Sequence, residues 1–259
     1  MKECIIIPAR YESTRFPGKP LALINGVPMV LRVWEKCIQV FDKKDVFIAT
    51  DDNRIVDKCL SWCKDIRMVK TSPYCRTGTD RVCHAYNFLE EAGHEYYWVI
   101  NVQGDEPLIR AIDINSIRNS YLKNNDPMVA HCGYCSGLPF EYTDRNVIKI
   151  VKDIFGNLIY ASRAPIPHSK DGTTLGFLKQ VCIYAYTPEL LRSFETIEST
   201  VLEAREDIEI LRFIEARNRV RMVRVSNSSI SVDVPEDIKR VEERLNGQEK
   251  FREPSIGRD

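Results

Sequence analysis

Three cations follow a short apolar run near the start of the chain, and their spacing suits the binding of a polyanion. The run Cys4–Pro8 has the composition of a buried strand. The loop after it carries Arg10, Arg15 and Lys19, and its prolines and glycine exclude a helix. In an open α/β sheet, ligands bind outside the carboxyl ends of the strands. Most exposed cations are merely solvated, but three of them crowded beside an apolar strand favour a nucleoside triphosphate site.

An acidic segment at the end of a predicted central strand has the side chains of a metal site. The apolar strand Tyr96–Val102 runs into Gln103–Pro107, which contains Asp105 and Glu106. Mg²⁺ prefers carboxylate oxygens together with substrate phosphates. An acid before proline also often caps the next helix, so the residues alone leave both interpretations open.

Further polar residues stand where predicted strands or helices end. Arg76–Arg81 forms a loop-to-helix junction, whose unpaired N–H groups suit an anion, but an ordinary N-cap by Thr79 explains it equally well. Arg163 could hold a carboxylate bidentately, although a surface arginine is the simpler interpretation. The tyrosines of the strand Leu178–Tyr186 are either core aromatics or walls of a pocket.

The elements that must position these residues alternate between strand and helix. Strands are predicted at 4–8, 45–51, 66–69, 96–102, 128–134, 178–186 and 220–225, with a hairpin over 147–161. Helices are predicted from Pro28, from an N-cap at Asn53, over 113–124, from Pro188, over 201–216 and over 238–245. This alternation predicts a mostly parallel sheet, and the hairpin marks a second, smaller lobe.

Composition narrows the class of protein. The chain has 259 residues, with 37 Lys and Arg against 37 Asp and Glu, so no global field favours nucleic acid or an anionic membrane. The nine cysteines form no compact metal-ligand cluster; Cys132 and Cys135 have redox spacing but stand in a predicted strand, and buried thiols in a reducing cytoplasm are the expectation. We expect no signal peptide and no membrane span, which would need about 20 apolar residues.

The motifs resemble those of a known family. Ile7–Arg10, Ser13–Arg15 and Pro17–Pro20 are similar to the N-terminal signature of sugar nucleotidyltransferases, and more narrowly of the 3-deoxy-manno-octulosonate (Kdo) cytidylyltransferases. Asn101–Pro107 matches that family without a change, and Ser162–Pro167 resembles a further segment. The resemblance runs from about residue 4 to about residue 245 in the family's order. It implies an α/β, Rossmann-like nucleotidyltransferase fold and transfer of CMP from CTP to a 3-deoxy-2-ulosonic acid.

The resemblance also implies roles for individual residues. It assigns Mg²⁺ to Asp105 and Asp233, which with Lys19 form the predicted catalytic set. The predicted nucleotide-binding residues are Ala9, Arg10, Ser13, Arg15, Lys19, Thr79 and Arg81. The predicted sugar-binding residues are Gln103, Arg163, Gln180, Tyr184, Glu209 and Ile210.

Departures from the family pattern fall in the sugar site. Gln180 stands where the family has a histidine, and Ile210 where it has a glutamine. Losing a hydrogen-bond partner can change discrimination by orders of magnitude. Kdo is therefore the first expectation for the acceptor, with an amino-ulosonate or a phosphonate as the alternative. Two other functions compete with this one: a transferase that uses UTP or GTP, and a binding protein without catalytic activity.

The resemblance implies one domain over residues 1–247. Its nucleotide-binding half covers about 1–125, a sugar-binding and dimerisation lobe about 126–217, and a return to the core 218–247, with a polar tail at 248–259. A homodimer, a cytoplasmic location and a part in lipopolysaccharide precursor synthesis are implied in the same way.

Overall fold

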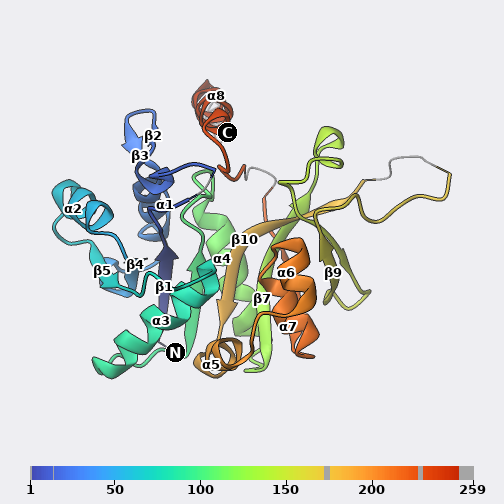
Figure 1. Ribbon diagram of the computed structural model, residues 1–259, viewed down its shortest axis with the longest axis horizontal. Helices are drawn as coiled ribbons and strands as arrows, with labels where there is room; N and C mark the ends of the chain where they lie inside the picture. Colours follow the sequence, from blue (N-terminus) through green and yellow to red (C-terminus); the bar gives the residue numbers. More distant parts are fainter. Residues whose placement is uncertain (1, 14, 172–175, 227–229, 251–259) are drawn as a thin grey trace, which may run out of the picture.

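A twisted sheet with helices on both faces organises the chain (Figure 1). The computed structural model describes residues 2–13, 15–171, 176–226 and 230–250. The strands lie in the order β11-β7-β10-β6-β1-β4-β5, and β8 and β9 branch from β10. Neighbouring strands on this path are parallel except where β10 runs antiparallel to β6 and β7. The predicted fold class, a mostly parallel sheet with a smaller mixed part, is confirmed.

The bounds of the elements are as follows. The strands are β1 (Glu3–Pro8), β2 (Leu23–Ile24), β3 (Val27–Pro28), β4 (Val46–Thr50), β5 (Arg67–Lys70), β6 (Trp98–Val102), β7 (Val129–Ser136), β8 (Lys149–Lys152), β9 (Leu158–Ser162), β10 (Leu178–Tyr186) and β11 (Arg219–Arg224). The α-helices are α1 (Met29–Cys37), α2 (Asn53–Trp62), α3 (Gly78–Glu91), α4 (Ala111–Lys123), α5 (Pro188–Thr196), α6 (Val201–Glu206), α7 (Ile210–Glu215) and α8 (Glu236–Lys250). Short 3₁₀ turns lie at Lys19–Leu21, Lys43–Asp45 and Pro139–Glu141.

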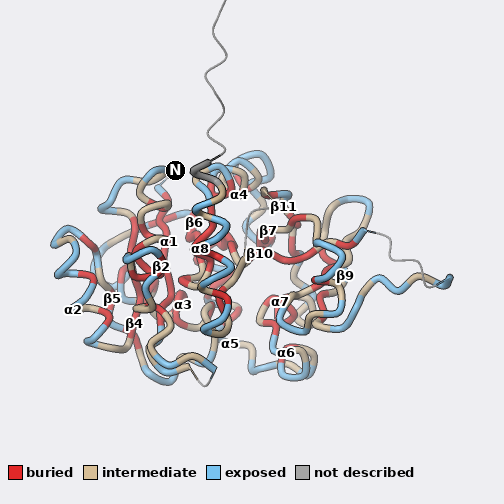
Figure 2. The backbone as a smooth tube through the Cα atoms, turned by 90° about the horizontal axis from the view of Figure 1, so that it is seen from above, coloured by how far each residue is buried: buried red, intermediate tan, exposed pale blue. Residues whose placement is uncertain are grey.

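The strand β1 shows why both faces of the sheet are covered. Its residues alternate between the two hydrophobic cores: Cys4 and Ile6 pack with α3 and α5, while Ile5 and Ile7 pack with α1 and α4. A strand that is apolar at every position has to be buried on both sides. Figure 2 accordingly shows the buried residues concentrated along the strands and the exposed ones on the outer helices and loops.

The helix predicted over 201–216 is wrong as a single element. It is broken into α6 and α7, because α6 ends at Asp207 in the left-handed region (φ 53°), where the Asp207 N–H still bonds the carbonyl of Glu203. Aspartate tolerates this conformation better than most side chains. The break turns residues 207–209 out of the helix.

Two predicted helix caps are shifted along the chain. Thr77 caps α3 through a reciprocal bond with Asp80, so Thr79 lies inside the helix. Asp52, and not Asn53, caps α2 by accepting the Arg54 N–H. Both corrections place the capping side chain before the first helical residue, as the geometry of a cap requires.

Residues 126–217 do not form a separate layer. They supply β7 and β10 to the middle of the main sheet, while the hairpin of β8 and β9 projects to one side of it (Figure 1). The chain then returns through β11, and α8 packs over Ile24, Met29 and Leu108 through Val241. Of the predicted polar tail, residues 251–259 lie outside the described residues.

All nine cysteines are free thiols. Cys132 and Cys135 are buried on opposite faces of β7, in different cores, so their side chains point away from each other. Burial raises the pKa of both thiols, which disfavours the reactive thiolate. In the described part of the chain, every helix is too short or too polar to cross a bilayer.

Candidate active site

A cavity of about 370 Å³ opens where the sheet strands end. The strands β1 and β6 are parallel, so their carboxyl ends, at Pro8 and Val102, lie at the same edge of the sheet. The strand β10 runs the other way, and its register places Ile183 opposite Val102, so that Gln180 and Cys182 extend past the end of β6. The cavity is lined by Ala9, Arg10, Ser13, Arg15, Lys19, Arg76, Thr77, Gly78, Arg81, Gln103, Asp105, Asn146, Arg163, Gln180, Cys182, Tyr184, Asp207, Ile208, Glu209 and Asp233, among others.

The basic loop and the two acids meet in this cavity. The Lys19 ammonium lies 2.6 Å from the Asp105 carboxylate and donates to the carbonyl of Val232 at 2.9 Å. Arg15 pairs with Asp233 at 3.0 Å. Residues separated by 86 positions or more therefore share one electrostatic cluster.

Local backbone geometry holds the loop in place. Gly18 adopts φ 72°, in the left-handed region that glycine favours, and its N–H bonds the carbonyl of Tyr11 at 2.9 Å. The Arg54 guanidinium stacks on the Tyr11 ring, 3.3 Å from its centroid. The turn thereby directs Lys19 inward from the start of a 3₁₀ turn.

The pKa values of the cluster show how closely its charges interact. Burial alone would lower the pKa of Lys19, but the charge and hydrogen bond of Asp105 raise it above its usual value. Burial raises the pKa of Asp233; Lys19 opposes this shift and the charge of Asp105 adds to it. The charge of Asp105 thus opposes ionisation of Asp233, and a divalent cation bound between them would relieve this repulsion. Asp105 and Asp233 fit Mg²⁺, which takes one or two protein carboxylates and completes its shell with phosphates and water.

A polar wall lies on the other side of the cavity. The Gln103 amide donates to Glu209 Oε1 at 3.1 Å, and the backbone N–H of Thr79 donates to Glu209 Oε2 at 2.9 Å. Burial raises the pKa of Glu209, against the opposing effect of hydrogen bonds from Thr79 and Thr77. Gly78 lies so close to Gln103 that a side chain at its position would overlap the Gln103 amide unless that amide moved.

Alternate residues of β10 continue this wall. The Gln180 amide donates to the Tyr184 hydroxyl at 2.7 Å, and that hydroxyl also hydrogen-bonds the Cys182 thiol. The Gln180 side chain is only 8% exposed, and its carbonyl oxygen has no hydrogen-bond partner among the described residues. A buried acceptor of this kind favours a ligand that donates a hydrogen bond.

The predicted nucleotide residues do not all reach the cavity. Ala9, Arg10 and Ser13 line it, and the Ala9 N–H is bonded to the carbonyl of Ala49. Thr79 is buried and does not line it; its hydroxyl lies 3.4 Å from that of Tyr186.

Arg81 reaches the cavity but is held inside the protein. Its side chain is 3% exposed and pairs with Asp51 at 3.1 Å and with the Thr71 hydroxyl at 2.5 Å. Among the residues around the start of α3, Arg76, Thr77 and Gly78 therefore present the accessible polar surface.

Two predicted sugar residues are placed differently from the others. Arg163 lines the cavity, but its guanidinium donates to the backbone carbonyls of Glu206, Arg145 and Asp207, at 2.6, 3.0 and 2.9 Å. These bonds hold Arg163 against the end of α6 and the loops beside the cavity, and they use three of its five N–H donors. Ile210 is fully buried in the hydrophobic core and does not line the cavity.

Comparison with known proteins identifies the family of the chain. The cytidylyltransferase family model matches residues 4–222. The chain belongs to the cytidylyltransferase family. It is 39% identical over 243 residues to the 3-deoxy-manno-octulosonate cytidylyltransferase of Desulfosudis oleivorans, which covers 93% of this chain and 96% of the relative. It is 37% identical over 246 residues to the 8-amino-3,8-dideoxy-manno-octulosonate cytidylyltransferase of Shewanella amazonensis, covering 95% and 99%.

A solved structure is similar over the whole fold. The CMP:2-keto-3-deoxy-manno-octonic acid synthetase complexed with CTP matches with a TM-score of 0.84 and 31% identity, covering 96% of this chain and all of that one. The same fold is therefore found in a relative whose structure contains CTP.

Several cavity residues of this cytidylyltransferase were missed in the sequence. Asn146, which accepts a hydrogen bond from Arg15 at 3.2 Å, stands in a loop without a motif. Asp207 and Ile208 were hidden by the prediction of one continuous helix. Arg76 stands just before the start of a helix, and this position could have led to its prediction as a cavity residue.

Proposed function

We propose that the protein transfers CMP from CTP to the anomeric hydroxyl of a 3-deoxy-2-ulosonic acid, Kdo or a variant of it, and releases pyrophosphate. The observation that carries this proposal is the pairing of the basic loop with two acids, Lys19 with Asp105 and Arg15 with Asp233, inside one cavity. The names of the relatives, which specify Kdo and its 8-amino variant, support the same class of acceptor.

The reaction needs positioning and charge neutralisation more than covalent help from the protein. The anomeric oxygen attacks the α-phosphorus, the bond from that phosphorus to the bridging oxygen of pyrophosphate breaks, and the hydroxyl proton is lost to water. Arg10, Arg15 and Lys19 would hold the β- and γ-phosphates and balance the charge of the departing pyrophosphate. The Lys19 ammonium has three donors, of which Asp105 and Val232 occupy two, so one remains for a phosphate oxygen.

The acid pair provides for a divalent cation. Asp105 and Asp233 would hold Mg²⁺, which, when bound, neutralises charge on the α-phosphate and polarises the attacking oxygen. Gln103 and Glu209 form the wall that would orient the sugar, because their hydrogen bond fixes both side chains at the cavity.

An amino-ulosonate is the second candidate acceptor. The unpartnered carbonyl of Gln180 accepts a hydrogen bond equally well from a hydroxyl or from an ammonium group. Relatives named for the 8-amino sugar are about as similar to this chain as relatives named for Kdo.

We include a homodimer and a cytoplasmic location in the proposal. Several large apolar side chains between Leu138 and Ile159 are exposed, and another copy of the chain would cover such side chains. The free, mostly buried thiols suit a reducing compartment.

A screen of pyrophosphate release tests the proposal. CTP, UTP and GTP are each offered with Kdo, with its 8-amino variant and with phosphonates, in the presence and absence of Mg²⁺. Release with CTP and an ulosonate, dependent on Mg²⁺, is the expected result. Release with UTP or GTP alone would indicate another nucleotidyltransferase, and no release with any pair would favour a silent binding protein.

A further inference from the structure

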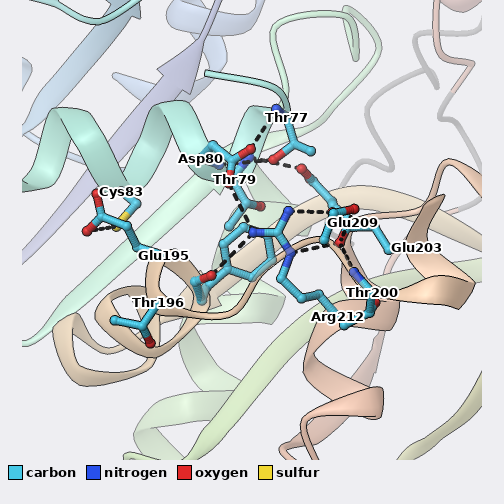
Figure 3. A network of polar contacts seen from close by, with 12 residues as sticks. Thr77, Thr79, Asp80, Cys83, Glu195, Thr196, Thr200, Glu203, Glu209 and Arg212 are labelled. Carbon is cyan, nitrogen blue, oxygen red and sulfur yellow. Dashed lines mark hydrogen bonds and ion pairs between the residues drawn. The ribbon is translucent and has the colours of Figure 1, made fainter. Parts of the chain in front are cut away.

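One buried guanidinium connects two helices on the cavity rim (Figure 3). The side chain of Arg212, on α7, is 1% exposed and stacks on the Phe194 ring, 3.7 Å from its centroid. It forks onto Glu203 with contacts of 2.8 and 2.5 Å. Its third nitrogen reaches Asp80 at 3.1 Å. Figure 3 shows these bonds converging on Arg212 from α3 and α6.

Both acids that Arg212 contacts are parts of helix caps. Asp80 accepts the Thr77 N–H and closes the capping box of α3. Glu203 accepts the Thr200 N–H and closes the capping box of α6. A capping box fixes where a helix starts and how the chain enters it. Arg212 therefore ties together the first turns of two helices that are distant in sequence.

The start of α3 and the junction between α6 and α7 build the cavity wall. Thr77 and Gly78 line the cavity directly, and the Thr79 N–H bonds Glu209, which also receives the Gln103 amide. Glu209 stands at the start of α7, and its carbonyl accepts the backbone N–H of Arg212. A shift of α3 relative to α7 would therefore break the bonds that hold Glu209 and Gln103.

We propose that Arg212 is a positioning residue, which fixes the spacing between the start of α3 and the α6–α7 junction so that Glu209 and Gly78 face the substrates together. It acts through Asp80 and Glu203 and does not itself bind substrate. The kinetic part of this inference rests on the proposed cytidylyl transfer; the structural part does not.

Charge and shape both make arginine specific at this position. Glu203 is 4% exposed, so removing its partner leaves a buried carboxylate without compensation. A lysine would restore one positive charge, but its point-like ammonium cannot fork onto Glu203 and reach Asp80 at the same time. The planar guanidinium is thus required for the link and not only for neutralisation.

The test compares Arg212→Met and Arg212→Lys with a matched control. Arg118 makes a similar double contact, at 2.8 and 2.7 Å, with the 4%-exposed carboxylate side chain of Glu3, which lies in β1 at the end away from the cavity. Arg118 itself is 40% exposed, so Arg118→Met removes a less buried ion pair of similar geometry without touching the cavity wall. For each variant, thermal unfolding, the KM values of CTP and the sugar acid, and hydrogen exchange of the amides at 77–80 and 207–210 are measured.

The expected result separates positioning from simple stabilisation. Both Arg212 variants should raise the KM values on the order of 10- to 100-fold, the size of effect that a displaced binding group produces. They should also accelerate amide exchange at 77–80 and 207–210. Arg118→Met should lower the unfolding temperature while leaving KM and that exchange unchanged.

Several outcomes would overturn the inference. Folded Arg212 variants with wild-type KM values and wild-type exchange at these amides would make Arg212 merely structural, and so would full rescue by Arg212→Lys. If Arg212→Met fails to fold, the folded Arg212→Lys variant, which keeps a positive charge, must give the same local exchange, or the inference fails. If the wild-type protein releases no pyrophosphate, the proposed function fails, whereas the exchange data still decide the role of Arg212.

Discussion

At the scale of single residues, the cavity is organised by charge neutralisation. Lys19 and Arg15 each pair with one acid, so the basic loop is drawn onto the carboxylates that a metal ion would need. Binding of a metal nucleotide would break these ion pairs, because the metal ion would bind the two aspartates and the phosphates would bind Arg15 and Lys19. The same residues thereby serve both halves of the ligand.

Asp105→Asn should abolish turnover and leave the fold intact. The amide keeps an acceptor for Lys19 but loses the negative charge that attracts Mg²⁺. Metal ions supply several kcal/mol of transition-state stabilisation, so a loss of about 10³-fold in pyrophosphate release is expected. Asp52→Asn is the control, since asparagine caps a helix as well as aspartate does and this position does not line the cavity. Retained Mg²⁺-dependent activity in Asp105→Asn would refute the metal assignment.

Glu209→Gln should stabilise the protein at neutral pH while it impairs activity. Burial raises the folded-state pKa of Glu209 above its ordinary value of 4.5, so the folded state holds the proton more tightly than the unfolded state. Stability is therefore lost as the pH rises through the window between 4.5 and the raised value, and glutamine avoids that loss. The gain in unfolding temperature over wild type should grow from acid to neutral pH.

Glu206→Gln provides a control of the opposite sign. Burial opposes ionisation of Glu206, but bonds from Ser162, Arg163 and Tyr160 lower its pKa below the usual value. The ionised Glu206 side chain therefore stabilises the folded state at pH values above its pKa in the unfolded chain, and this stabilisation is lost as the pH falls. Glu206→Gln should accordingly lower the unfolding temperature most at neutral pH. Equal pH trends for the two variants would contradict this account of Glu209.

The sequence could predict site residues that stand in short motifs, and not those whose role depends on a distant partner. Lys19, Asp105 and Asp233 each follow or precede an element end that is visible locally, and the fold brings them together. The commitment of Arg163 to backbone carbonyls could not be seen, because those carbonyls belong to loops more than ten residues away. Ile210 was placed by resemblance, whereas burial puts it in the core.

At the scale of elements, the start of α3 packs closely against the residues that follow β6, beside the cavity. The capping box of Thr77 and Asp80 brings Gly78 against the side chain of Gln103. Local patterns located both elements but not the helix break after α6, because the residues of 201–216 are good helix formers throughout. The left-handed turn at Asp207 is decided by packing of α7 against the core.

Gly78→Ala should weaken binding of the sugar acid. The added methyl group would overlap the Gln103 amide, which must then move and release Glu209. We expect KM for the sugar acid to rise on the order of 10- to 100-fold, while the fold is kept because alanine favours a helix. Gly176→Ala is the control, since nothing lies within 4 Å of the added atom there. An unchanged KM for the sugar acid in Gly78→Ala would show that Gln103 can move without weakening sugar binding.

At the scale of the whole molecule, β10 decides how the two halves of the chain make one site. It inserts between β6 and β7 in the antiparallel sense, so its first residues, and not its last, reach the edge where β1 and β6 end. Alternation and turn signals predicted that this segment is a strand. Its partners and direction depend on pairing with residues about 80 positions earlier, which no local pattern encodes.

At the same scale, we propose that a second copy of the chain covers some of the exposed apolar side chains. Leu138, Phe140, Ile154, Phe155 and Ile159 are 52 to 93% exposed, within a stretch that includes the β8–β9 hairpin. We expect sedimentation velocity to show a homodimer for the wild-type protein and a monomer for Ile154→Asp combined with Phe140→Asp. Charged groups in an apolar interface cost desolvation energy, whereas on a free surface such changes usually shift stability by less than about 0.5 kcal/mol. Ile112→Asp, at a 58%-exposed position on α4, should leave the dimer intact. A wild-type monomer, or a double variant that remains dimeric, would show that these side chains do not form the interface.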